Sequence, residues 1–342
     1  IVGATAATAP PAVTLRWAVD LAGPGAADRR GPVRDVLLRL SLRDLQRQPR
    51  ASPASRRLRE TVLQWCRAHR RLQVWSWQMD PHPPAGSDTS AHDGVLWWMP
   101  SEGESQSQPE QLWAGFERLI TRYRGRPMVL MVPREWLIPP HALPGEGAAS
   151  SSLTARPLAP LLPILKRAVR ARSRPHLALA VPVGDLERPG RLALEALHRA
   201  VRDVEASLGR RWRIEIGVAV DCPRAALVLD SIGEQAGFAV LDLARLDAAL
   251  RGRGLPSDET EPRSFDAEGL GALLETGVRR IRKTHPPFWI AAAWRGMVSP
   301  ALLRLCLRWE LKAIAVPDEL TAPTGRAAAQ ASLRLEAEEP PS

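Results

Sequence analysis

The sequence predicts an α/β fold in which eight parallel strands, most of them followed by a helix, close into a (β/α)8 barrel. Three observations lead to this prediction. Strand-like and helix-like segments alternate from about residue 58 onward, and such alternation indicates a parallel sheet. Several strand-like segments are apolar at nearly every position, as strands covered on both faces must be. Eight units favour closure, and 342 residues exceed the roughly 250 residues that a barrel of this kind needs.

The predicted strands are short and rich in Val, Leu, Ile, Ala and Trp. They are expected at residues 72–79, 94–99, 128–132, 176–183, 212–220, 238–243, 288–293 and 311–316. Amphipathic helices are expected at residues 109–122, 158–172, 190–208, 224–235, 266–283 and 300–309. Pro109 suits a helix start, because the first N–H groups of a helix have no partner within it. The segment 80–93 is polar and Pro-rich, so no clear helix is expected after the first strand.

The chain is expected to have three parts. Residues 1–57 are too few for a stable core of their own and are interpreted as the remnant of a preceding domain with a helical linker. Residues 58–322 form the predicted barrel. Residues 323–342 are rich in Ala and Glu and are expected to be a disordered tail.

Charge and cysteine content argue against several classes of function. The net charge is +10, which invites a nucleic-acid interpretation, but the arginines are spread over amphipathic helices instead of forming one block. The three cysteines form no CxxC pair, so neither a zinc ribbon nor a disulfide scaffold is indicated, and a reducing cytoplasm is expected. No segment approaches the roughly 20 apolar residues of a membrane helix.

Several motifs resemble those of a known family. Residues 214–226, Ile-Glu-Ile-Gly-Val-Ala-Val-Asp-Cys-Pro-Arg-Ala-Ala, align without a gap to the fifth-strand signature of phosphoenolpyruvate-utilising enzymes, Glu-Ile-Gly-x-Met-Val-Glu-x-Pro-x-Ala-Ala. Residues 237–246 align to the family's Asp-Phe-Phe-Ser-Ile-Gly-Thr-Asn-Asp-Leu at the same spacing. Residues 94–100, 109–111 and 125–129 resemble its second strand, a Glu-Glu-Gln helix start and a Gly-Lys-Pro-Val-Val segment. The chain therefore resembles the C-terminal phosphoenolpyruvate-binding TIM barrel of enzyme I of the sugar phosphotransferase system.

The resemblance implies phosphoryl transfer from phosphoenolpyruvate to a histidine with Mg²⁺, yet most of the residues for that chemistry differ. The Mg²⁺-binding Glu of the fifth strand is Asp221 here, and the second metal-binding Asp falls on Arg245. The family's proton-donating cysteine falls on Ala293. An arginine would repel Mg²⁺, so a metal is doubtful and no cofactor is expected. On the same resemblance, residues 1–57 would be the end of a phosphohistidine-type domain.

The remaining candidate site is built from arginines. Arg134, Arg245 and Arg295 are expected at C-terminal strand ends, where barrel enzymes place their sites, together with Asp221. These four residues predict a site for a small molecule that carries phosphate or carboxylate, with Asp221 as a weak metal candidate or as a partner of Arg245. A further set of residues at the same mouth would either fill the pocket or stack on a ligand: Trp97, Trp98 and Trp294.

Three functional hypotheses stay open at this point. The first is a degenerate phosphoenolpyruvate-binding barrel that acts as a binding, dimerising or regulatory module, with a homodimer as one possible state. The second is an active phosphotransferase with a diverged pocket. The third is a basic scaffold for nucleic acid, against which the spread of the arginines argues.

Overall fold

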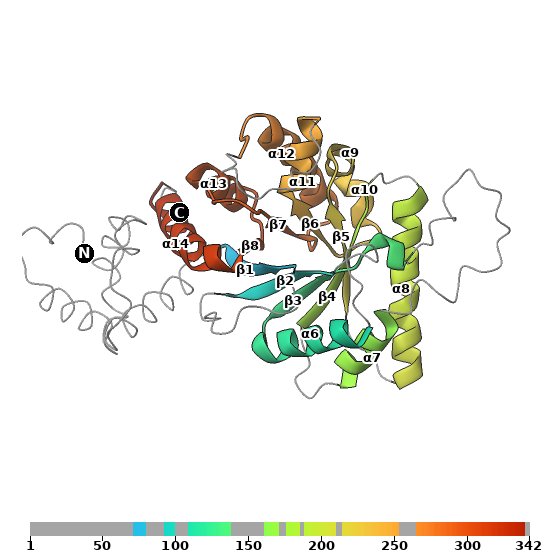
Figure 1. The fold of residues 1–342 in the computed structure, drawn as a ribbon. Coiled ribbons are helices and arrows are strands. Elements are labelled where there is room, and N and C mark those ends of the chain that lie inside the picture. Colours follow the sequence, from blue (N-terminus) through green and yellow to red (C-terminus); the bar gives the residue numbers. More distant parts are fainter. Residues whose placement is uncertain are drawn as a thin grey trace, which may run out of the picture.

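A computed structural model describes residues 71–79, 92–99, 109–137, 161–170, 176–184, 188–209, 214–252 and 265–338. Eight parallel strands form a closed barrel in chain order, and β8 pairs back onto β1 (Figure 1). The predicted fold class is confirmed. The predictions for residues 1–57 lie outside the described part of the chain. Among the described helices, none is long and apolar enough to cross a membrane.

The strands agree with the predicted segments to within a few residues. They are β1 (Gln73–Gln78), β2 (Gly94–Trp98), β3 (Pro127–Met131), β4 (His176–Pro182), β5 (Glu215–Val220), β6 (Phe238–Asp242), β7 (Trp289–Ala293) and β8 (Ala313–Pro317). The helices lie outside the barrel (Figure 1). They are α6 (Pro109–Arg122), α7 (Leu161–Arg170), α8 (Arg188–Leu208), α9 (Pro223–Leu227), α10 (Leu229–Gly233), α11 (Leu243–Leu250), α12 (Gly269–Thr284), α13 (Pro300–Arg308) and α14 (Asp318–Glu338). A 3-10 turn, η3 (Arg134–Trp136), follows β3.

The structure differs from the predicted helices in two places. The helix expected at 224–235 is divided into α9 and α10, because Val228 leaves the helical conformation with a ψ of 27°. Helix α11 was not predicted. The side chain of Asp242 ends β6 and begins this helix, since its carboxylate accepts a hydrogen bond from the Arg245 N–H at 3.1 Å, as N-terminal capping residues do.

The prediction of a disordered tail is wrong for residues 323–338, which form most of α14. Ala328, Ala329 and Leu333 of this helix are buried. Alanine has the highest helix propensity, and its small side chain lets α14 pack closely on β1 and α13. Residues 339–342 lie outside the described part of the chain.

The barrel interior combines large rings with small side chains. Trp75 and Trp77 point inward from β1, whereas the fully buried residues that β7 and β8 contribute to the same interior cluster are alanines. At the N-terminal end, Phe238 stacks on Trp289 with ring centroids 4.1 Å apart. Gly217 makes room for this stack, because a β-carbon on it would lie 2.5 Å from the Phe238 ring. The interior is therefore filled by side chains, as in other barrels of eight strands.

Candidate functional site

The C-terminal ends of the strands place the predicted site residues around one mouth of the barrel. Asp221 follows β5, Arg295 follows β7, and Arg134 lies in η3 after β3. Arg245 lies in the first turn of α11, directly after β6. Since all eight strands are parallel, their C-terminal ends face the same side, so residues distant in sequence come together there.

Arg245 is held between two carboxylates. Its Nη1 lies 3.5 Å from Asp221 Oδ2, and its Nε lies 3.5 Å from Asp242 Oδ2. The Gly184 N–H donates to Asp221 Oδ1 at 3.1 Å. Asp221 is thus a partner of Arg245, and its side chain is only 13% exposed. Asp242, the second acid among the described residues of the mouth, was not predicted from the sequence.

Among the described residues of the mouth, Asp242 is the most deeply buried ionisable group. Its side chain is completely buried, and this burial raises the pKa of its carboxyl group above the ordinary value of 3.8, although the Arg245 N–H and the charges of Arg295 and Arg245 act in the opposite direction. Its Oδ2 atom accepts no hydrogen bond from any described residue. A buried acceptor of this kind has unused capacity for a proton or for a donor group.

Two tryptophans and two arginines form a stacked row across the mouth, which we call the mouth ladder. The Arg295 guanidinium lies 4.8 Å from the Trp77 ring centroid. The Trp77 and Trp98 centroids are 6.3 Å apart at an interplanar angle of 30°, and the Arg245 guanidinium lies 4.9 Å from the Trp98 centroid. Both arginine contacts are within the usual range of cation–π attraction. The mouth ladder orders the Arg245 and Arg295 side chains before any ligand is present.

The prediction for the three mouth tryptophans is wrong for Trp97 and Trp294. Trp97 stacks on Phe116 of α6 at 6.0 Å, outside the barrel. Trp294 packs edge-on against Phe265, and its Nε1 donates to the Met297 carbonyl at 3.1 Å. Neighbouring residues of a strand point to opposite faces, so Trp97 and Trp98 cannot both face the mouth. Sequence reasoning also missed the mouth residue Trp77, although its phase with Trp75 on β1 was a usable signal.

Two of the three arginines have no acidic partner within the described residues. Arg295 forms no ion pair there, and its buried Nε has no hydrogen-bond acceptor. Arg134 likewise has no carboxylate partner among them. Its Nη1 lies 3.3 Å from the point that a β-carbon on Gly184 would occupy, so it lies next to the peptide that binds Asp221. Within the described ranges, the mouth therefore has three guanidinium groups for two carboxylates.

The mouth residues that the structure describes do not fit a Mg²⁺ site. Across the described ranges, no group of three or more His, Cys, Asp or Glu side chains could hold a metal ion. Asp221 and Asp242 are instead joined through the Arg245 guanidinium, which would repel a divalent cation. Ala293, at the position of the family's proton donor, is a buried barrel residue without an ionisable group. The arrangement is suited to binding an anion through arginines.

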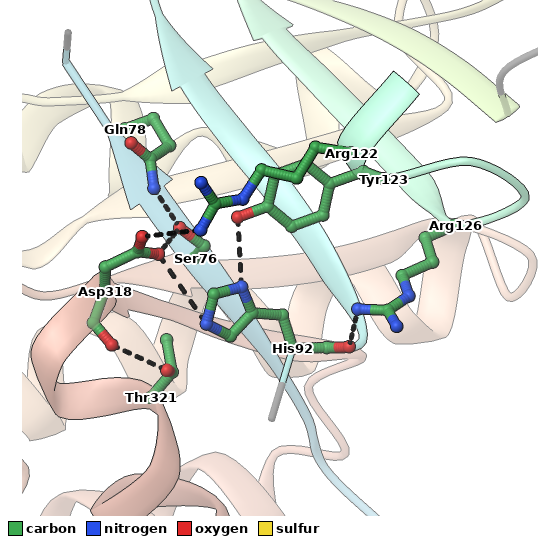
Figure 2. A network of polar contacts seen from close by, with 8 residues as sticks. All are labelled: Ser76, Gln78, His92, Arg122, Tyr123, Arg126, Asp318 and Thr321. Carbon is green, nitrogen blue, oxygen red and sulfur yellow. Dashed lines mark hydrogen bonds and ion pairs between the residues drawn. The ribbon is translucent and has the colours of Figure 1, made fainter. Parts of the chain in front are cut away.

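A second polar cluster lies on the outer face of β1, outside the barrel interior (Figure 2). The Ser76 hydroxyl donates to Asp318 at the start of α14. His92 Nε2 lies 3.6 Å from the same carboxylate, and Arg122 Nη2 lies 3.5 Å from it. The other ring nitrogen of His92 is 3.0 Å from the Tyr123 hydroxyl. This cluster joins β1, α6, α14 and the residue His92, which precedes β2. It was not predicted from the sequence, and we call it the β1 polar cluster.

The comparisons with known proteins found similar solved structures but no similar sequence or family. No protein-family model and no curated protein sequence matches the chain. The barrel is similar to a pyruvate kinase from Cryptosporidium parvum (7% identity, TM-score 0.47, 84% of this chain and 72% of that chain). It is also similar to a citrate lyase from Burkholderia xenovorans LB400 (11%, 0.45, 75% and 76%) and to an HpcH/HpaI aldolase from Desulfitobacterium hafniense DCB-2 (9%, 0.41, 74% and 88%). All three likenesses are structural and have low sequence identity.

Proposed function

We propose that this chain is a degenerate barrel of the phosphoenolpyruvate-binding type that binds a small anion at its C-terminal mouth without a metal ion. The observation that carries the proposal is the convergence of Arg134, Arg245 and Arg295 on a mouth where the described residues include two carboxylates, Asp221 and Asp242. The ligand would carry a phosphate or carboxylate group, because the planar guanidinium fork matches the oxygens of both.

The charges at the mouth support this proposal. Arg245 is shared by Asp221 and Asp242, so its charge is largely compensated within the chain. Arg295 and Arg134 form no ion pair with a described residue, although the charge of Arg295 acts on Asp242, so their guanidinium N–H groups can donate to a ligand. Partial burial of these arginines strengthens their attraction for an anion, since solvent screens buried charges less than exposed ones.

The motif resemblance supports the absence of phosphoryl transfer. In the family, acids after the fifth and sixth strands bind Mg²⁺, whereas here the second acid is replaced by Arg245. The guanidinium would supply a fixed positive charge between Asp221 and Asp242, and the chain would not need a metal for that charge. The family's proton donor is replaced by Ala293, so the enolate produced by phosphoryl transfer would have no acid at that position.

Calorimetric titration with phosphate, sulfate and phosphoenolpyruvate, each in the absence of divalent cations, tests the proposal. We expect binding that Arg295→Ala weakens by about 1.5–3 kcal/mol, the range for a hydrogen bond to a charged group. The matched control is Arg279→Ala, which removes an arginine on α12 that is 77% exposed and paired with Glu275, and binding should be unchanged. Failure of all three anions to bind would show instead that the mouth ladder closes the barrel as a structural plug.

A further inference from the structure

We propose that anion binding at the mouth is coupled to the uptake of one proton by Asp242. This inference rests on the proposed anion site and adds its regulation by pH. It concerns an acid that the predicted site does not include and at whose position the family motif has glycine.

The position of Asp242 is the first observation. Its side chain is completely buried, and its two oxygens have different surroundings. Oδ1 accepts the Arg245 N–H at the start of α11, so that oxygen is already used. Oδ2 accepts no hydrogen bond from the described residues. A proton on Oδ2 would therefore cost no existing hydrogen bond.

The second observation is the set of charges around this carboxylate. Arg245 of α11 lies 3.5 Å from Oδ2, and the charge of Arg295, which follows β7, also acts on Asp242. Asp221, which follows β5, is the nearby acid that acts against ionisation. The adjacent Cys222 thiol donates to the Gly184 carbonyl. Ionisation of Asp242 thus depends on two arginines that the proposed ligand also needs.

The described histidines do not take part in this balance. His176 begins β4 and His285 follows α12, both on the side of the barrel opposite the mouth. His198 lies on α8 and contacts the Gln235 carbonyl, and His92 belongs to the β1 polar cluster. Among the described acids facing the arginines, Asp242 is the one whose pKa is raised by burial.

The physical reason for proton uptake is that the bound anion and the Asp242 carboxylate compete for Arg245 and Arg295. An anion bound to these arginines places its negative charge near Asp242 and draws the guanidinium groups toward itself. Both effects disfavour the ionised carboxylate, whose pKa is already raised by burial, so Oδ2 takes a proton from the solvent. The resulting O–H group can donate a hydrogen bond, either to the anion or to a neighbouring acceptor.

The linkage between proton binding and anion binding determines whether the affinity rises or falls with pH. If the bound state holds one more proton than the free state, the affinity rises as the pH falls, by up to about tenfold for each pH unit. Sulfate is the appropriate probe, because it keeps the same charge around neutral pH and cannot itself contribute the proton. Phosphate is unsuitable, since it titrates in this range.

The test is calorimetric titration of the whole chain with sulfate, in pairs of buffers that differ in ionisation enthalpy, at several pH values. The dependence of the heat on the buffer gives the number of protons taken up. We expect proton uptake and tighter binding at low pH for the wild type. Asp242→Asn, which keeps the side-chain shape and the Oδ1 acceptor, should bind sulfate without uptake. The matched variant Asp230→Asn removes a largely buried carboxylate that pairs with Arg280 of α12, away from the mouth, and should retain uptake.

Sulfate binding without proton uptake, or uptake that persists in Asp242→Asn, would overturn the inference while leaving the anion site intact. Absence of sulfate binding at every pH would remove the anion site itself, and the inference with it. An infrared difference spectrum of the wild type gives an independent measurement if Asp242→Asn does not fold. Addition of sulfate should increase the absorption of a protonated carboxyl group, and a spectrum without this increase would contradict the inference.

Discussion

Asp318 is the common acceptor of the β1 polar cluster, and Asp318→Asn is the substitution that tests its contribution to stability. The carboxylate accepts the Ser76 hydroxyl and lies within 3.6 Å of His92 and 3.5 Å of Arg122. The asparagine side chain keeps the size and one acceptor oxygen but removes the charge. The side chains of Ser76, His92 and Arg122 would then share an uncharged acceptor.

The burial of the partners sets the size of the effect. The side chains of Asp318, His92 and Arg122 are 14%, 2% and 16% exposed, so water cannot fully replace the lost contacts. A hydrogen bond to a charged group contributes about 1.5–3 kcal/mol, and we expect Asp318→Asn to lower the free energy of unfolding by about 2–3 kcal/mol. That is a large part of the roughly 5–15 kcal/mol typical of a folded domain.

Urea unfolding followed by circular dichroism measures this change. The control is Glu275→Gln, which breaks the pair with Arg279 on the surface of α12 and should cost no more than about 0.5 kcal/mol. Equal, small effects of the two substitutions would refute the reasoning. They would show that the β1 polar cluster contributes no more than an exposed ion pair.

Three further predictions follow from buried groups. Tyr123 is the single tyrosine of the chain, and burial raises its pKa above the ordinary value of 10.0, so ultraviolet titration should show one phenol that ionises only above that pH. Burial of the neutral phenol therefore stabilises the folded state fully below pH 10.0, and this stabilisation is lost as the pH rises through the raised pKa. A phenol that ionises at the ordinary pH of 10.0 would contradict this. Gly217→Ala should destabilise the barrel by about 1–3 kcal/mol, because its β-carbon would lie 2.5 Å from the buried Phe238 ring. Gly237→Ala, where the nearest atom would be 3.7 Å away, is the control, and equal melting temperatures would refute the steric argument. The free energy of unfolding of Asp242→Asn, minus that of the wild type, should increase as the pH rises above 3.8. The reason is that the wild type loses stability between pH 3.8 and the raised pKa of Asp242, whereas the asparagine does not ionise. A difference that decreases with pH in urea unfolding would contradict the raised pKa.

Much of the barrel was predictable because its strands are covered on both faces. Such strands appear in the sequence as short apolar runs, and eight runs separated by amphipathic segments are compatible with few folds other than a barrel. The role of Asp242 could not be predicted in this way. The residue was included in the predicted strand 238–243, and the family motif has glycine at its position, so nothing in the sequence marked it as the cap of a new helix and the second acid of the mouth.

Only part of the candidate site was predicted, because the end of a strand determines where a residue lies but not which way its side chain points. Arg134, Arg245, Arg295 and Asp221 lie at the mouth because each follows the C-terminal end of a strand. Trp97 and Trp294 do not, because alternation along the strands turns them outward. The β1 polar cluster was beyond sequence reasoning for another reason. Its central contact joins Ser76 to Asp318, 242 positions later in the chain, and no local pattern links the two.

The most direct test of the central claim is to measure the affinity of the whole chain for phosphoenolpyruvate in the presence of a chelator and again in excess Mg²⁺. A site built on Arg134, Arg245 and Arg295 should bind phosphoenolpyruvate in the chelator. Added Mg²⁺ should not tighten binding, and no pyruvate should be released when a family phosphohistidine domain is supplied. Binding that requires Mg²⁺, together with pyruvate release, would contradict the account and show that the mouth still holds a working metal site.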